Sequence, residues 1–452
     1  MESCTEEQRL AIGAVLNGES VFITGPGGTG KSYLLDVLYR EFNGLGKTMA
    51  ITAMTGCAAL LIGAHAKTLH SWAGIGLGRE PLSHIVQGIH TNGRKKKNWK
   101  KTDCLVIDEV SMMTPALLEL LDQVGRNIRK CYNKPFGGLQ VVFVGDFYQL
   151  PPVCKTGEKM AFAFESPIWK AAITRVCTLT TIHRQKDQVF QTVLGEARRG
   201  ELSDESYRIL SERKAAKWKG NPIRPTMLFT RNDDINTINR SYLDKLEGEA
   251  KVFEATTESP PRMNPEDVAY RVQRLDKDAP YEPTLRLKVG AQVMLLAQQY
   301  DERDKQKVPI HGLVNGSRGV VTDFTPGGNP VVKFMNGKTV IIGEHTWSSD
   351  ETESAVKRKQ LPLRLAYALT IHKAQGASLD SALIDVGSAT FEYGQAYVAL
   401  SRVRSLDALY IYDVEKAAFR VHPSVRAFYD SIQPAYEEET TFVESNQDAV
   451  PV

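Results

Sequence analysis

The residues from Gly25 to Ser32 have the composition and spacing of a phosphate-binding loop. They read Gly-Pro-Gly-Gly-Thr-Gly-Lys-Ser and join an apolar run, Val21–Thr24, to a stretch expected to be helical, Tyr33–Phe42. Glycines let successive backbone N–H groups face a phosphate, and the first turn of a helix adds partial positive charge. We expect Lys31 to neutralise the terminal phosphates and Ser32 to ligate Mg²⁺. The nucleotide contacts predicted in this loop are Gly25, Gly27, Gly28, Thr29, Gly30, Lys31 and Ser32.

Two adjacent carboxylates follow an apolar strand downstream of this loop. Leu105-Val-Ile is followed directly by Asp108 and Glu109. Asp108 is placed to hold Mg²⁺, and Glu109 to orient and deprotonate an attacking water molecule. Taken alone, such a pair is as often a solvated acidic turn, but after a phosphate-binding loop it predicts the second half of an ATPase site. The cofactors expected are therefore ATP and Mg²⁺.

Two later stretches carry polar side chains suited to sensing a γ-phosphate. Gly145–Pro152, GDFYQLPP, follows another apolar run and contains Gln149, whose amide can contact that phosphate. Tyr397–Arg402, YVALSR, ends in an arginine that can reach a nucleotide held by another domain, as arginine fingers do. By itself, Arg402 would more often be a surface arginine. In the company of the other motifs we expect it to be a finger.

Short apolar strands alternate with helices in two parts of the chain, which predicts an α/β fold with doubly wound parallel sheets. In the first part the expected strands are Val21–Thr24, Met49–Thr52, Cys104–Ile107 and Gln140–Val144. In the second part they are Met227–Thr230, Ala382–Val386 and Leu409–Tyr412, with helices at Asp233–Leu246 and Gln395–Val403. Between Leu285 and Ile342, short β-runs broken by glycine predict a small antiparallel barrel inserted into the second part.

The composition is that of a globular protein with more than one domain: 452 residues, 42% hydrophobic and 24% charged, with a net charge of +3. No apolar run approaches the roughly 20 residues that span a bilayer. The polar, acidic residues Met1–Arg9 do not resemble a targeting peptide. We therefore expect an intracellular protein, of the nucleus, the mitochondrion, or a bacterial or viral cytoplasm, with no membrane partner. Scattered cysteines without a C-x-x-C pair predict no zinc site.

The segment Arg94–Lys101, RKKKNWKK, concentrates positive charge around Trp99. Positive charge combined with a stacking ring suits single-stranded nucleic acid. A solvated basic loop is an equally good interpretation of the same residues. The segment belongs to a glycine- and lysine-rich stretch at about 73–102, which we interpret as a small insertion into the first α/β part.

Taken together, these motifs resemble those of the PIF-type (petite integration frequency) DNA helicases, in the B branch of helicase superfamily one. Thr5–Gln8 resembles the adenine-reading glutamine motif of that family, and Met112–Gly138 resembles the stretch before its GDxxQLPP motif. Further segments that resemble the family are Thr52–Ala59, Thr68–Gly78, Gly312–Gly319 and Thr370–Gly376. The sequence departs from the family pattern at His183, where an aromatic residue is commoner, and at Ala374, where serine is.

The resemblance implies two RecA-like P-loop domains. Residues 1–175 would form the first, with the basic insertion at about 73–102, and residues 176–284 and 360–430 would form the second. Residues 285–359 would form an inserted, Src-homology-like β-barrel, and 431–452 an acidic, disordered tail.

The resemblance also assigns site residues. Gln8 would read adenine, and Gln149, Arg184 and Arg402 would sense the γ-phosphate and stabilise the transferring group. Gln375 and Gly376 would also contact the nucleotide. The residues implied to contact DNA are Thr52, Thr55, His70, Ser71, Asn315, Thr370, His372 and Lys373. Taken singly, such polar residues are equally well explained as helix caps or loop polar groups.

The activity implied is that of an ATP-dependent DNA helicase, which moves 5′-to-3′ on single-stranded DNA as a monomer and unwinds forked or structured duplexes. ATP hydrolysis would be coupled to closure of the two RecA-like domains. Three alternatives stay open: a related motor that acts on RNA, a subunit of a recombination nuclease, and a non-unwinding protein that clamps DNA and uses ATP only as a switch.

Overall fold

The structure, a computed structural model, describes residues 4–432 apart from 63–65, 77, 79, 154–158, 217, 219–222, 231–232, 262, 279–280, 298–312, 314–315 and 349–354. The chain divides into two compact units. Unit 1 comprises residues 1–54, 65–184 and 421–452, and unit 2 comprises 55–64 and 185–420. The last helix of the described chain therefore belongs to the same unit as the first.

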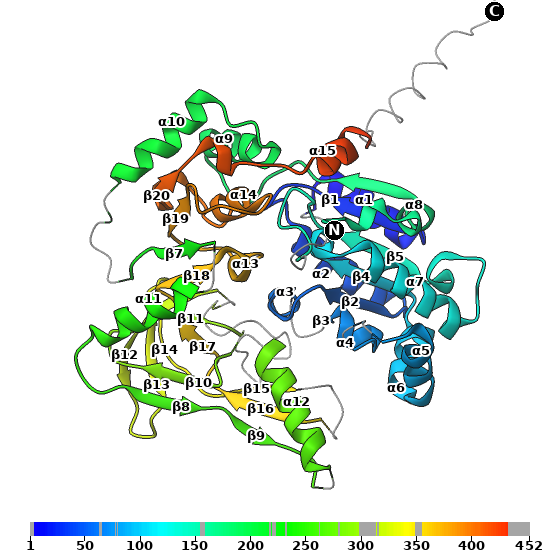
Figure 1. The fold of residues 1–452 in the computed structure, drawn as a ribbon, viewed down its shortest axis with the longest axis horizontal. Coiled ribbons are helices and arrows are strands. Elements are labelled where there is room, and N and C mark those ends of the chain that lie inside the picture. The colour runs from blue at the N-terminus through cyan, green and yellow to red at the C-terminus, as the bar shows by residue number, and fades with distance from the viewer. Residues whose placement is uncertain are drawn as a thin grey trace, which may run out of the picture. The chain divides into compact units, whose positions relative to one another are not determined.

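Unit 1 is built on a six-stranded, all-parallel sheet in the order β3-β2-β4-β5-β1-β6 (Figure 1). Its strands are β1 Val21–Thr24, β2 Met49–Ala53, β3 Ala66–Thr68, β4 Cys104–Asp108, β5 Gln140–Val144 and β6 Arg175–Thr178. Its helices are α1 Glu6–Leu16, α2 Lys31–Gly44, α4 Leu69–Ala73, α5 Leu82–Thr91, α6 Gly93–Lys101, α7 Pro115–Arg129, α8 Pro167–Ala172 and α15 Pro423–Asp430, with short 3₁₀ turns at Val110–Met112, Pro135–Gly138 and Ala163–Glu165. Every residue of β1 and β4 is buried, as in a parallel sheet covered on both faces.

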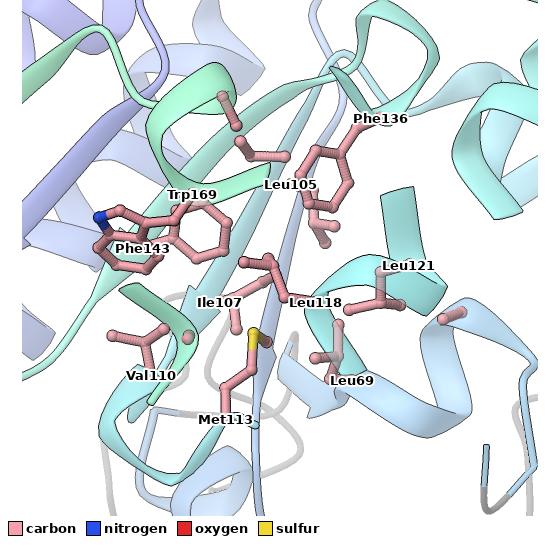
Figure 2. Packing of buried hydrophobic residues seen from close by; sticks show 14 of the residues in the cluster. Leu69, Leu105, Ile107, Val110, Met113, Leu118, Leu121, Phe136, Phe143 and Trp169 are labelled. Carbon is pink, nitrogen blue, oxygen red and sulfur yellow. The ribbon is translucent and has the colours of Figure 1, made fainter. Parts of the chain in front are cut away.

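One part of the core of unit 1 lies between this sheet and α7, where Leu105 and Ile107 of β4 face Leu118 and Leu121 of the helix (Figure 2). The buried residues of α7 recur every three or four positions, which gives the helix one apolar face. Thr114 starts the helix, since its hydroxyl accepts the N–H of Leu117, and Pro115 occupies its first turn.

The basic segment Arg94–Lys101 is helical, and its tryptophan lies in the core. Trp99 on α6 is fully buried, its ring is 4.8 Å from that of Trp72, and its indole N–H donates to Ala73 O (2.9 Å). Asn98 Nδ2 donates to Trp72 O (2.9 Å) and Lys95 Nζ to Gly74 O (3.3 Å). The loop interpretation and the stacking role of Trp99 are therefore both wrong, because α6 uses these side chains to hold the end of α4.

Unit 2 contains a four-stranded parallel sheet in the order β18-β7-β19-β20. These strands are β7 Thr226–Phe229, β18 Ala368–Thr370, β19 Ala382–Val386 and β20 Leu409–Val414. The helices of the unit are α3 Gly56–Ile62, α9 Gln188–Arg199, α10 Asp204–Glu212, α11 Asp233–Asp244, α12 Pro265–Asp278, α13 Ile371–Ala374 and α14 Gln395–Leu400, with 3₁₀ turns at Arg213–Ala215, Leu406–Ala408 and Lys416–Ala418. The strands predicted from apolar runs in both units are confirmed to within two residues.

Antiparallel sheets make up the rest of unit 2. One has five strands in the order β14-β13-β12-β11-β17, one pairs β10 with β8, and one has the order β15-β16-β9. The strands are β8 Lys251–Glu254, β9 Thr256–Glu258, β10 Thr284–Leu287, β11 Gln292–Leu295, β12 Arg318–Phe324, β13 Pro330–Phe334, β14 Thr339–Ile341, β15 His345–Ser348, β16 Lys357–Gln360 and β17 Leu363–Leu365. The α/β class with parallel sheets is thus confirmed, as are antiparallel strands between Leu285 and Ile342.

Buried Arg318 joins the five-stranded sheet to the parallel sheet of unit 2. Its guanidinium donates to Arg224 O and Thr226 Oγ1, both at 3.1 Å, and to Ser381 Oγ at 3.2 Å. Thr226 is the first residue of β7, Arg224 lies two residues before it, and Ser381 directly precedes β19. None of the helices in the described ranges is long and apolar enough to cross a lipid bilayer.

Candidate nucleotide and DNA sites

Four polar segments of unit 1 follow four neighbouring strands of its sheet. They are Gly25–Ser32 after β1, Asp108–Glu109 at the end of β4, Gly145–Pro152 after β5 and Leu179–Arg184 after β6. In the order β4-β5-β1-β6 these strands are parallel and in register, so the four segments meet at one edge of the sheet. The carboxyl edge of a parallel sheet is where α/β proteins bind nucleotides.

The phosphate-binding loop packs so closely against the segment after β6 that only glycine fits at its start. A Cβ added to Gly25 would lie 2.2 Å from the carbonyl oxygen of Leu179. Gly30 caps α2 with φ of 82°, a left-handed conformation that favours glycine. Lys31 Nζ lies over the loop and donates to Gly25 O (2.6 Å) and Pro26 O (2.9 Å). A glycine cradle, an ammonium group and a helix N-terminus together fit a polyphosphate.

The acidic pair combines a buried carboxylate with a residue in an unusual backbone conformation. Asp108 is 8% exposed, and burial followed by the charge of Glu109 raises its pKa to about 7, although the Glu109 N–H and Lys31 oppose this shift. Such a poorly solvated carboxylate fits a divalent cation, whose charge would compensate it. Glu109 has φ of 56°, and a Cβ on Gly145 would come within 3.0 Å of Val110 N. The turn that carries Glu109 therefore rests directly on the end of β5.

Gln149 and Arg184, the two γ-phosphate sensors predicted in the first half of the chain, both emerge at this edge. Gln149 is 6% exposed, and its N–H donates to Asp146 O (2.9 Å) in the turn after β5. The backbone N–H groups of His183 and Arg184 donate to Gly28 O at 2.9 and 3.3 Å. The segment that carries Arg184 is thus attached to the phosphate-binding loop itself.

Glu7 on α1 also holds this last segment, a role that its place in the Thr5–Gln8 motif did not indicate. Its carboxylate accepts the N–H of Thr180 (2.9 Å) and of Thr181 (3.4 Å), and also the Thr180 hydroxyl. The neighbouring Gln8 is 2% exposed, and its amide accepts the N–H of Thr5 (3.1 Å) and donates to Thr29 O (3.2 Å). Helix α1 therefore holds both the phosphate-binding loop and the segment before Arg184. An adenine contact by Gln8 remains a prediction.

Arg402, the predicted finger, is held within unit 2. It is 2% exposed and donates to Val398 O (2.8 Å), Ala377 O (3.3 Å) and Ser401 Oγ (2.6 Å). Gln375 and Gly376 follow α13 in the same unit, and Gly376 has φ of 77°. These three residues therefore lie on a different unit from the phosphate-binding loop, which is what a finger contributed by a second domain requires.

The predicted DNA contacts fall into both units. His70 and the exposed Ser71 lie on α4 of unit 1, whereas Thr370, His372 and exposed Lys373 lie at the start of α13 in unit 2. Burial lowers the pKa of His372.

The predicted threonines act as structural groups. Thr370 caps α13 by accepting the N–H of Lys373 (3.1 Å), and Thr55 accepts the N–H of Ala58 (3.1 Å) at the start of α3. Thr52 is fully buried, and its hydroxyl donates to Val106 O (2.7 Å). Its side chain is therefore not exposed on the surface as a DNA contact would be. Asn315 lies outside the described residues.

The chain matches the PIF1-like helicase family over residues 3–205. It is 41% identical to human "ATP-dependent DNA helicase PIF1" over 432 residues, which are 95% of this chain and 64% of that protein. The chain thus spans just under two thirds of the length of that curated relative.

Solved structures agree with this match. The Pif1 helicase of Candida albicans is 35% identical with a TM-score of 0.79, and the match covers 95% of this chain and 99% of that one. The Bacteroides Pif1 helicase, solved in complex with ADP-AlF3 and single-stranded DNA, is 29% identical with a TM-score of 0.65, and the match covers 96% of this chain and 97% of that one. Family and architecture therefore agree along nearly the whole chain.

Proposed function

Because the chain belongs to the PIF1-like helicase family, we propose that it is a DNA-stimulated, Mg²⁺-dependent ATPase that moves 5′-to-3′ on single-stranded DNA and unwinds duplexes. The observation that carries this proposal is the meeting of four polar segments at the carboxyl edge of β4-β5-β1-β6. They supply a phosphate cradle, a carboxylate pair, a glutamine and an arginine, the groups that hydrolysis of a nucleoside triphosphate needs. The direction of movement comes from the family resemblance.

Within this site each residue has a distinct task. The N–H groups of the phosphate-binding loop and Lys31 bind the phosphates, and Glu109 accepts a proton from the attacking water. Gln149 and Arg184 contact the γ-phosphate from the ends of β5 and β6. Ser32 and Asp108 would hold Mg²⁺, which when bound neutralises charge on the phosphate oxygens.

The two parallel sheets correspond, in this proposal, to two RecA-like domains, and the five-stranded antiparallel sheet to the inserted barrel. ATP binding closes the domains and brings Arg402 to the nucleotide, and hydrolysis reopens them. Residues on α4 and α13 hold the single strand alternately, so that each cycle advances the protein along the DNA. Forked duplexes with a free 5′ tail are the expected substrates.

Two measurements test the proposal. Steady-state ATP hydrolysis with Mg²⁺ should rise strongly when single-stranded DNA is added, and a matched RNA oligonucleotide should stimulate less. Strand displacement should require a 5′ tail on the loading strand. Equal turnover with and without DNA would favour an ATP-switched clamp, equal stimulation by RNA would favour an RNA motor, and unwinding from a 3′ tail alone would reverse the polarity.

A further inference from the structure

Helix α15 is part of the nucleotide-binding unit, although it lies more than two hundred residues beyond the motifs of that unit (Figure 1). Val425 is 1% exposed and belongs to the core of unit 1. Phe428 stacks on Phe164 with ring centroids 4.2 Å apart, and it contacts Phe147 and Trp169 edge-on. The helix is therefore anchored by apolar contacts that place its last turn at the catalytic edge.

Tyr429, in that last turn, reaches the ends of two neighbouring strands with one hydroxyl group. Its oxygen is 2.7 Å from Thr24 Oγ1, accepts the N–H of Phe147 (3.1 Å) and donates to Asp146 Oδ1 (3.3 Å). Thr24 ends β1 directly before Gly25, whereas Asp146 and Phe147 follow β5.

The groups that the hydroxyl joins are buried and belong to the site machinery. Thr24 is 1% exposed and Asp146 is fully buried, so both need hydrogen-bonding partners inside the protein. Asp146 Oδ1 also accepts the N–H of Tyr148 (3.2 Å), and Asp146 O accepts that of Gln149 (2.9 Å). The turn that presents Gln149 is therefore organised around the carboxylate that Tyr429 binds.

We propose that Tyr429 is a positioning residue for ATP hydrolysis. Its hydroxyl ties the turn after β5 to the end of β1 and so keeps Gln149 in place beside the phosphate-binding loop. This proposal rests on the proposed ATPase function. The aromatic ring has a separate task, because it stacks on Tyr148 with centroids 4.5 Å apart and anchors the helix. Removing only the hydroxyl therefore separates positioning from anchoring.

The test compares Tyr429→Phe with the parent and with Tyr132→Phe, which removes a hydroxyl from a ring that is 63% exposed on the same unit. In Tyr429→Phe we expect the DNA-stimulated kcat to fall about threefold to tenfold, with KM for ATP unchanged, because the turn that carries Gln149 loses its hydrogen bonds to the hydroxyl. Affinity for ADP–aluminium fluoride should fall by a similar factor, whereas ADP affinity and binding stoichiometry should not change. Tyr132→Phe should match the parent in every measurement.

A second variant tests Thr24, the partner of the Tyr429 hydroxyl at the end of β1. Thr24→Val keeps a β-branched side chain in the strand and removes only the bond to Tyr429, which Tyr429→Phe removes as well. The double variant Thr24→Val/Tyr429→Phe should therefore be no slower than Tyr429→Phe alone. Additive losses, or a parental kcat in Tyr429→Phe, would overturn the proposal. A fall in kcat with equal loss of ADP affinity would also overturn it, since that indicates general loosening.

Amide exchange gives a readout that needs no turnover. In Tyr429→Phe the Phe147 amide, which donates to the hydroxyl, should exchange about tenfold faster, while core amides of β4 keep their protection. If the parent protein hydrolysed no ATP, the proposed function would fail, but the exchange of Phe147 would still decide the role of Tyr429. Unchanged exchange would overturn it.

Discussion

Asp108 and Glu109 are adjacent carboxylates with different environments, so their substitutions should fail differently. Glu109→Gln keeps the size of the side chain but cannot accept a proton from water, and turnover should fall by about 10²–10⁴ while ATP and single-stranded DNA still bind. Lys31→Ala or Asp108→Asn should instead weaken nucleotide binding, since phosphate or metal charge goes uncompensated. Fluorescent-nucleotide titration and steady-state ATPase assays on all three variants check this. Hydrolysis by Glu109→Gln at near the parent rate would place the base elsewhere.

Burial of Asp108 also has a cost in folding free energy that depends on pH. Because its pKa rises from 3.8 to about 7 on folding, the folded protein favours the protonated form. The contribution of Asp108 to the free energy of unfolding is therefore lost as pH rises from about 4 through about 7. Asp108→Asn avoids the cost and keeps an oxygen for the Glu109 N–H, so in EDTA it should exceed the parent by about 1–4 kcal/mol at pH 8 and match it near pH 4.

Urea unfolding at the two pH values measures this difference. Asp430→Asn, a change of an exposed carboxylate at the end of α15, is the matched control and should leave stability unchanged at both. Equal stability of Asp108→Asn and the parent at pH 8 would show that the folded protein solvates Asp108 better than its burial indicates.

At the scale of elements, α6 turns its indole inward, whereas Lys97 and Lys100 are exposed and Lys96 is half-buried. These three lysines are the ones to test for contact with DNA phosphates, whereas Lys95 donates to Gly74 O and is best left intact. If α6 binds DNA, alanine at the three positions should make the log–log salt dependence of single-strand affinity shallower, by about 0.7 for each phosphate that a lysine no longer neutralises.

Fluorescence anisotropy over a salt series measures that slope. Lys47→Ala/Lys170→Ala, which removes two exposed lysines elsewhere on unit 1, serves as the charge control. A slope identical to the parent's in the α6 variant would show that these lysines form a solvated face. The helix would then serve only to hold α4.

At the scale of the whole molecule, the proposed coupling of ATP hydrolysis to DNA binding requires a residue of unit 2 to act on the nucleotide bound by unit 1. Arg402→Ala should lower DNA-stimulated turnover by about 10³-fold or more while DNA binding is largely retained. Because Arg402 also donates to Val398 O and Ala377 O, thermal unfolding is measured in parallel, and Arg402→Lys keeps the charge without the planar fork. Exposed Arg404→Ala is the control. Turnover of Arg402→Ala within about threefold of the parent would exclude a finger at this position.

The sequence by itself determined the features whose physics is local. Val21–Thr24 and Cys104–Asp108 are continuous apolar runs because their strands are buried on both faces, and the glycines after β1 serve a turn made within a few residues. The same locality explains why seven strands of the two parallel sheets were predicted to within two residues, whereas β3, β6 and β18, which are short or carry polar residues, were not predicted. It also explains the error at Trp99, since the surrounding charge suggested an exposed ring, and no neighbouring residue shows that α6 turns that ring towards Trp72.

Only the tertiary structure decided which distant groups complete the site. The strand order places β6 beside β1 and so brings Leu179 against Gly25. The spacing of residues along the chain does not predict this contact. The carboxylate of Glu7 and the hydroxyl of Tyr429 act on residues far away in sequence, and a single polar side chain carries no periodicity that identifies its partner. Local hydrogen bonds and apolar periodicity are encoded within a few residues, whereas these long-range interactions exist only once the sheet has brought its strand ends together.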